Sequence, residues 1–79
     1  MPVFVLYGRP ACHLCQDMEA ELLRWREQAS FELQVIDIDT DPALVERYGT
    51  RVPVLVAGAE EVCSPFFDEV AFRRYLSPV

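Results

Sequence analysis

The sequence predicts one α/β domain over residues 1–79, with the element order β-α-β-α-β-β-α. Two observations predict this class. The chain opens with a β-prone apolar run, an amphipathic helical stretch and a second strand, an order that favours a right-handed parallel crossover. Two short strand-like runs near the C-terminus lie close enough together to form a hairpin. We therefore expect a four-stranded mixed sheet flanked by three helices.

The first predicted strand covers residues 3–7, and Gly8 and Pro10 end it. Its unbroken apolar character is typical of a strand that is covered on both faces. A helix is predicted to follow from Cys12 to about Gln28, because apolar residues recur along it every three or four positions. These residues are Leu14, Met18, Leu22 and Trp25.

The second predicted strand begins near Phe31. Apolar residues alternate as far as Val35 and then change phase at Ile36. We therefore expect a strand that is buried on both faces, or one that carries a bulge near residue 35. The pair Asp41-Pro42 is typical of a helix cap and first turn, and it predicts a short helix over residues 43–48 that ends at Gly49.

The C-terminal part predicts two strands and a helix. Residues 53–57 form the third strand, with a proline at its first position, where a missing N–H does least harm. The pair Gly58-Ala59 allows a tight turn into a fourth strand over residues 60–63. A last helix is predicted over roughly residues 67–76, with Val70, Phe72, Tyr75 and Leu76 among its apolar positions.

Composition excludes several classes of partner. Hydrophobic residues make up 52% of the chain, which is enough for a core without a framework of disulfides. Thirteen acidic residues, seven arginines and no lysine give a net charge of −6, so we expect neither nucleic acid nor a membrane as partner. No stretch approaches the ~20 apolar residues that span a bilayer, and the N-terminal run is too short for a signal peptide. We expect a cytoplasmic monomer.

The motif Cys12-His13-Leu14-Cys15 stands where a loop enters the first helix. This spacing puts both sulfurs on one side of the first helical turn, close enough for a bridge. Cys12 is expected among unpaired backbone N–H groups at the positive end of the helix dipole, which stabilises a thiolate. We therefore expect Cys12 to be the nucleophile and Cys15 to be the resolving thiol, in a pair that cycles between dithiol and disulfide.

Three motifs resemble the glutaredoxin-like members of the thioredoxin superfamily, and the resemblance covers nearly the whole chain. The run 7–15 is similar to the family's strand, loop and CxxC helix, and the run 35–39 resembles its second strand. Arg51-Val52-Pro53 falls where the family has a threonine-valine-cis-proline loop that faces the CxxC. The resemblance implies a thioredoxin-like fold, a cis Pro53, and a Val52 backbone that pairs with the substrate's chain.

Arg9 and His13 are further candidates for substrate binding. Arg9 stands three residues before the nucleophile, where glutaredoxins usually carry a lysine, and it either stabilises the thiolate or a substrate carboxylate or is an ordinary solvated charge. His13 adjoins the nucleophile and could tune it when protonated. On a helix surface it can equally point to water, which is the interpretation that we favour.

The chain departs from the family in the segment that would bind glutathione. The family's glycine pair and following acidic residue, which hold the γ-glutamyl group, have no counterpart, and residues 60–65 stand in their place. We therefore expect a protein or small-molecule disulfide as substrate and no bound cofactor. The electron donor is either glutathione or an external reductase.

Two other functions stay open. The CxxC could hold zinc or an iron–sulfur cluster, although structural zinc takes four ligands and the chain offers no second CxxC or histidine pair, so we predict no metal ligands. A non-catalytic adaptor could also keep the fold without turnover. The third cysteine, Cys63, is expected to pack under the last helix, and a regulatory role for it is the alternative.

Overall fold

The computed structural model describes residues 1–76, and its elements follow the predicted order with one short 3-10 helix added. The elements are β1 (Val3–Gly8), α1 (His13–Trp25), β2 (Glu32–Asp37), η1 (Ile38–Thr40), α2 (Pro42–Tyr48), β3 (Val54–Ala57), β4 (Glu60–Cys63) and α3 (Glu69–Arg73). Among these described residues, no helix is both long and apolar enough to cross a membrane.

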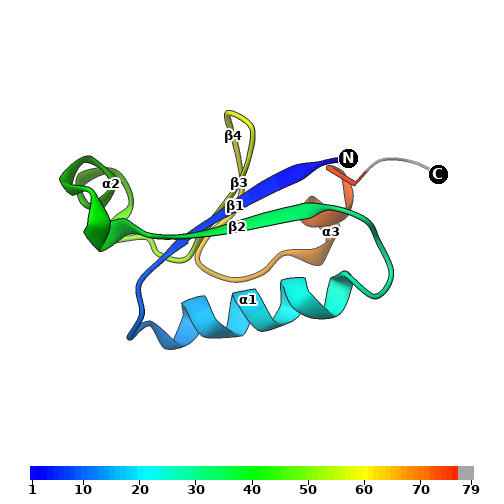
Figure 1. Cartoon of the computed structure of the whole chain (residues 1–79), viewed down its shortest axis with the longest axis horizontal. Coiled ribbons are helices and arrows are strands. Elements are labelled where there is room, and N and C mark those ends of the chain that lie inside the picture. The colour runs from blue at the N-terminus through cyan, green and yellow to red at the C-terminus, as the bar shows by residue number, and fades with distance from the viewer. Residues whose placement is uncertain (77–79) are drawn as a thin grey trace.

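The four strands form one mixed sheet in the order β2-β1-β3-β4. β1 and β2 are parallel and are joined through α1, whereas β3 is antiparallel to both β1 and β4. Helix α1 runs along one face of the sheet, and α2 lies beyond the ends of β1 and β2 (Figure 1). The predicted crossover, hairpin and mixed sheet are confirmed.

Two hydrophobic clusters hold these layers together. The larger lies between the sheet and helices α1 and α3, and the ring of Phe72 packs there against the rings of Phe4 and Phe31 with centroids 4.8 and 5.4 Å apart. The smaller lies under α2, where Tyr7 of β1 stacks on Tyr48 at 4.4 Å. Phe4 and Leu6 of β1 belong to the larger cluster and Tyr7 packs against the smaller one, so the two clusters lie on opposite faces of β1.

Both long predicted helices are shorter than expected. Helix α1 ends at Trp25, and the N–H groups of Glu27 and Gln28 then donate to the carbonyls three residues before them, in tighter turns than those of an α-helix. The prediction that Leu14 belongs to the buried face is also wrong, since Leu14 is 39% exposed and the neighbouring Cys15 faces the sheet instead. Helix α3 covers only Glu69–Arg73 of the predicted residues 67–76.

Strand β2 differs from its prediction as well. It is an edge strand, and it pairs with β1 in an unbroken register from Val3↔Glu32 to Gly8↔Asp37, with no bulge. Val35 is 51% exposed, so the strand is not buried on both faces. The change of phase arises because alternate residues of β2 contribute apolar side chains to different faces, as the pleat requires. The cover on β1 is also uneven: Phe4 and Leu6 are buried, and Val5 on the opposite face is only half-buried.

Candidate active site

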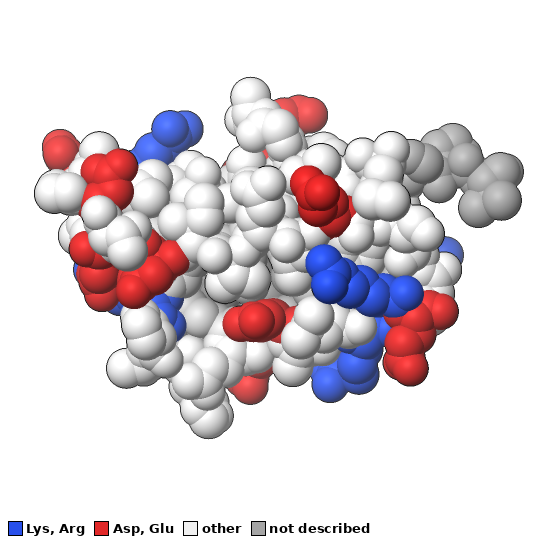
Figure 2. All heavy atoms as spheres, viewed as in Figure 1, with Lys and Arg blue, Asp and Glu red and all other residues white. Residues whose placement is uncertain are grey.

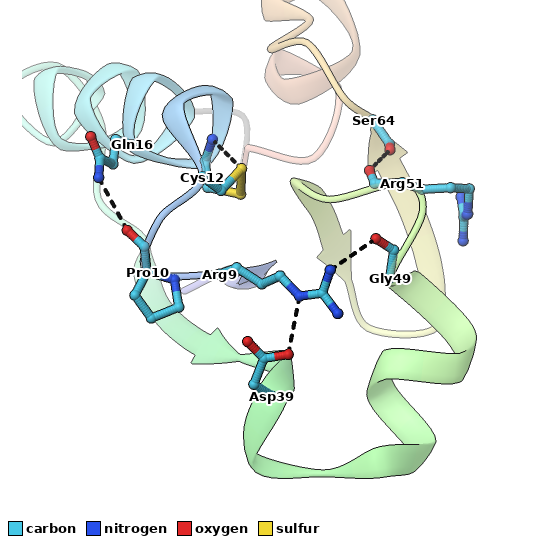
Figure 3. The surroundings of a disulfide bond; sticks show 9 residues. Arg9, Pro10, Cys12, Gln16, Asp39, Gly49, Arg51 and Ser64 are labelled. Carbon is cyan, nitrogen blue, oxygen red and sulfur yellow. Dashed lines mark hydrogen bonds and ion pairs between the residues drawn. A yellow bond between two sulfur atoms is a disulfide. The ribbon is translucent and has the colours of Figure 1, made fainter.

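The loop that carries the CxxC is fixed by two local hydrogen bonds. β1 ends at Gly8, and the Cys12 backbone N–H then donates to the Arg9 carbonyl at 3.2 Å, which closes a turn. The side chain of Gln16, in the first turns of α1, donates to the Pro10 carbonyl at 3.2 Å (Figure 3). The loop is thereby held against the helix that it enters.

Cys12 is the N-cap of α1. Its backbone is extended (φ −100°, ψ 111°), and its Sγ accepts a hydrogen bond from the Cys15 N–H at 3.1 Å. The two cysteines form a disulfide with their Cα atoms 5.1 Å apart, which lies within the ordinary range for a bridge. The structure thus brings together the two residues predicted to carry the chemistry.

The two sulfurs have different surroundings. Cys12 is half-buried at the start of the helix, whereas Cys15 is only 6% exposed. Helix α1 has 13 residues and no acidic residue in its first turn, so no local carboxylate opposes negative charge at its N-terminus. Once the bridge is reduced, the Cys15 N–H and the helix dipole favour a thiolate at Cys12 over one at Cys15.

Gly8 gives Cys15 the space that it occupies. A Cβ added at Gly8 would stand 3.0 Å from the Cys15 Sγ and 3.1 Å from its Cβ, so one of the two residues would have to move. The last residue of β1 and the first turn of α1 therefore meet in close contact at the buried sulfur. No sequence motif indicated this requirement beyond the expectation that Gly8 ends the strand.

We expect Gly8→Ala to lower the free energy of unfolding by about 1–3 kcal/mol, the usual cost of overpacking a core. The change should also alter the reduction potential of the pair, because the displaced group carries one of its sulfurs. Chemical denaturation and equilibration with a dithiothreitol redox buffer would measure the two effects. Wild-type values for both would contradict the close contact described here.

Arg9 is held by residues far away in the sequence. Its Nε donates to the Asp39 carboxylate at 3.1 Å, and its Nη1 donates to the Gly49 carbonyl at 3.4 Å, just after α2 (Figure 3). Arg9 therefore ties the CxxC loop to η1 and to the end of α2. A contact with the thiolate or with a substrate carboxylate stays a prediction. His13 is exposed at the first position of α1.

The Arg51-Val52-Pro53 loop lies beside the CxxC loop. Tyr7 pairs with Val54 across the antiparallel strands β1 and β3. Pro53, which precedes Val54 in the chain, therefore lies next to Gly8 at the end of this strand pair. The Val52–Pro53 peptide bond is cis, as the resemblance implied, and Pro53 is buried while Val52 is half-buried. Figure 3 draws Arg51 of this loop among the surroundings of the disulfide.

Sequence reasoning missed the residue that anchors this loop. The Ser64 hydroxyl, just after β4, donates to the Arg51 carbonyl at 2.6 Å (Figure 3). The Arg51 guanidinium pairs with Glu61 at 2.6 Å, and its backbone N–H donates to the Tyr48 carbonyl at 2.8 Å. No local sequence pattern indicates a contact over 13 residues. A second cis bond, Ser64–Pro65, follows the anchor and was not predicted either.

Cys63 packs under the last helix, as predicted. It is 9% exposed and belongs to the larger hydrophobic cluster. Burial, the largest effect, raises the pKa of the Cys63 thiol above its ordinary value of 9.0; a hydrogen bond from the Asp68 backbone N–H lowers it in part, and the carboxylates of Asp68 and Glu61 add smaller increases. The third thiol therefore stays protonated at neutral pH.

This raised pKa predicts how stability depends on pH. As pH rises past 9.0, the unfolded chain loses the Cys63 proton while the folded chain keeps it, so the free energy of unfolding falls. We expect Cys63→Ala to flatten this fall as the pH rises past 9.0. Denaturation of the oxidised protein, in which the other two cysteines do not titrate, would measure the difference. Equal slopes for both proteins would contradict the burial of the thiol.

Residues 1–76 contain no group of three or more His, Cys, Asp or Glu side chains arranged to hold a metal ion. The CxxC by itself supplies two ligands, and a structural zinc site takes four.

Comparison with known proteins places this geometry in context. The sequence matches the model of the Glutaredoxin-like domain (DUF836) over residues 3–77. The solution structure of protein Ne2328 from Nitrosomonas europaea is similar, with 42% identity, a TM-score of 0.85, and coverage of 96% of this chain and 92% of that one. Protein XcR50 from X. campestris has 37% identity and a TM-score of 0.67, covering 91% of this chain and 92% of its own.

A thioredoxin is also among the similar structures. This mutant thioredoxin from Halobacterium salinarum NRC-1 is 31% identical, with a TM-score of 0.64, and the match covers 99% of this chain and 77% of that one. The fold is therefore thioredoxin-like. No curated protein matches the sequence.

Proposed function

This chain belongs to the glutaredoxin-like domain family, and from that premise we propose that it is a thiol–disulfide oxidoreductase that uses Cys12 and Cys15. The main observation behind this proposal is the Cys12–Cys15 disulfide at the N-terminus of α1, in which the Cys12 sulfur caps the helix. No acidic side chain stands in the first turn of that helix, and the more exposed cysteine is the one that the helix dipole favours as a thiolate.

The proposed reaction has two exchange steps. In the reduced protein, the Cys12 thiolate attacks one sulfur of a substrate disulfide; that S–S bond breaks, and the departing thiolate takes up a proton. Cys15 then loses its proton and attacks the Cys12 sulfur of the mixed disulfide, which releases the second substrate sulfur as a thiol. The substrate gains two electrons and two protons, and the Cys12–Cys15 pair becomes oxidised. An external dithiol or glutathione returns the pair to its reduced form.

The surroundings of the pair favour a polypeptide as substrate. The Val52 backbone, on a loop that Ser64 anchors through the Arg51 carbonyl, is proposed to pair with the substrate chain. Leu14 lies between the two cysteines in sequence and is 39% exposed, which offers an apolar contact next to the reacting sulfurs.

The proposed setting is a reducing compartment such as the cytoplasm, which keeps cycling thiols reduced. A net charge of −6 without any lysine makes nucleic acid a poor partner, and we propose that the protein acts on disulfides as a monomer.

A turnover assay tests the function. The protein should accelerate reduction of a disulfide-linked peptide by dithiothreitol, and the double variant Cys12→Ser/Cys15→Ser should give only the rate of dithiothreitol alone. Equal rates for the two proteins would overturn the proposal. In that case, metal bound to the purified protein would favour the metal-site alternative, and thiols that react only after unfolding would favour a non-catalytic adaptor.

A further inference from the structure

The outer edge of β2 has backbone groups available for pairing. β2 is the edge strand next to β1, and the Glu32 N–H points inward, because it donates to the Pro2 carbonyl at 2.8 Å. Since the backbone groups of successive residues in a strand point to alternate sides, those of Leu33 and Val35 point away from β1. Val35 thus offers both an N–H and a carbonyl to another strand.

This edge lacks the usual protection. In natural proteins, charged residues, prolines or bulges along an edge strand prevent it from pairing with a strand of another chain. The middle of β2, residues 33–36, carries none of these, and its register with β1 is unbroken. Charged residues of β2 stand only at its ends, at Glu32 and Asp37.

A groove runs along the same strand. It has a volume of about 380 Å³, lies between β2 and α1, and is lined by Leu6, Pro10, Val35 and Ile36, with Cys15 among its other lining residues. Val35 shares the α1 face of the sheet, because it pairs with the buried Leu6. Its 51% exposure leaves an apolar side chain uncovered beside an apolar groove.

The rim of this groove is acidic. Glu19 of α1 and Asp37 of β2 line it, and neither carboxylate forms an ion pair with another residue of the described chain. The cation at the groove, Arg9, already pairs with Asp39. In Figure 2 the middle of the face over β2 is uncharged, and acidic side chains gather toward its α2 end.

We propose that the β2 edge and this groove form a docking site for an extended, basic segment of a partner protein. The segment adds to the sheet through the outward backbone groups of Val35 and places an apolar side chain in the groove. Flanking lysines or arginines face Glu19 and Asp37. A second copy of this chain fits poorly, because it would bring two chains of net charge −6 together and add further carboxylates at the strand ends.

The groove adjoins the CxxC loop, since Arg9 and Cys15 line it, but binding of a segment there requires no thiol exchange. Its test therefore uses the oxidised protein, in which no thiol exchange takes place. The probe is the capped peptide acetyl-Lys-Thr-Val-Thr-Lys-amide, whose two lysines and central valine share one face of a strand. Amide chemical shifts of isotope-labelled protein would be followed as the peptide is added.

We expect saturable shifts along residues 33–37 and at Glu19. Val35→Lys should weaken binding by at least about tenfold, because it charges the edge and the groove. Val3→Lys is the matched control: Val3 is 43% exposed against 51% for Val35, lies on the opposite face of the sheet and gains the same charge. Its affinity should stay within about twofold of wild type. The peptide with glutamates in place of both lysines should not bind.

Several results would overturn the docking site. One is the absence of saturable shifts in wild type. Another is an equal loss of peptide affinity in Val35→Lys and Val3→Lys, both verified as folded by their amide spectra. Such a result would show that the effect comes from overall charge alone. Self-association that depends on concentration and disappears in Val35→Lys would show that a second copy occupies the edge instead.

Discussion

Cys12→Ser is expected to reduce disulfide-reductase turnover to the uncatalysed background, a loss of about 10³-fold or more, whereas Cys15→Ser is expected to accumulate a mixed disulfide. The reason is the difference in position. The Cys12 sulfur caps the helix and is half-buried, and Cys15 lies one turn inside at 6% exposure. Cys12 is therefore expected to meet a substrate sulfur first, and Cys15 adjoins the Cys12 sulfur that it must then attack to release the substrate.

Mass spectrometry after incubation with a disulfide-linked peptide would measure this asymmetry. The Cys15→Ser protein should carry one covalently attached peptide half at Cys12, and Cys12→Ser should carry none. Cys63→Ala serves as the control, since the Cys63 thiol is buried in the core and should not affect turnover. Brief alkylation of the reduced wild type should label Cys12 first. Preferential labelling of Cys15 or Cys63 would reverse or reject the assigned roles.

Local patterns were enough to predict most elements of this fold. The Asp41-Pro42 pair marks the start of α2, where the Asp41 carboxylate accepts a hydrogen bond from the Ala43 N–H at 2.9 Å. The position of Cys12 at a helix start also follows from local sequence, because a strand, a breaker and an amphipathic run occur in order. The cis bond before Pro53 could be expected from family resemblance alone, since a proline that opens a strand is ordinarily trans.

Features that depend on contacts far apart in the sequence could not be predicted. Periodicity indicated that β2 has apolar residues on both faces, but strand order decides burial, and β2 is an edge strand. The hydrogen-bond partners of Arg9 lie 30 and 40 residues away in the sequence. No local motif could therefore reveal that this arginine near the nucleophile has a structural role. The hydrogen bond from the Ser64 hydroxyl to the Arg51 carbonyl could not be predicted for the same reason, because the two residues are distant in the sequence.

Glutathione is expected to be a poor substrate partner compared with a disulfide-bonded polypeptide. The tripeptide presents two carboxylates and one α-amino group, and each needs an oppositely charged or hydrogen-bonding partner. Both arginines near the pair are engaged, Arg9 by Asp39 and Arg51 by Glu61. At the segment that would receive the γ-glutamyl group, Pro65 has no N–H, and the Asp68 carboxylate already accepts from the Ala71 N–H at 3.0 Å.

The loss of one charge-assisted contact costs about 1.5–3 kcal/mol, or roughly ten- to a hundredfold in affinity. Steady-state assays with a glutathionylated peptide and with a disulfide-linked peptide would compare the two substrates on the same protein. Glu61→Gln sharpens the comparison, because it frees the Arg51 guanidinium and removes a carboxylate that repels an anionic ligand. It should lower KM for the glutathionylated peptide and leave the other substrate's KM nearly unchanged. Efficient, saturable turnover of the glutathionylated peptide by the unaltered protein would contradict this expectation, because it would require a backbone donor for the γ-glutamyl group that Pro65 does not supply.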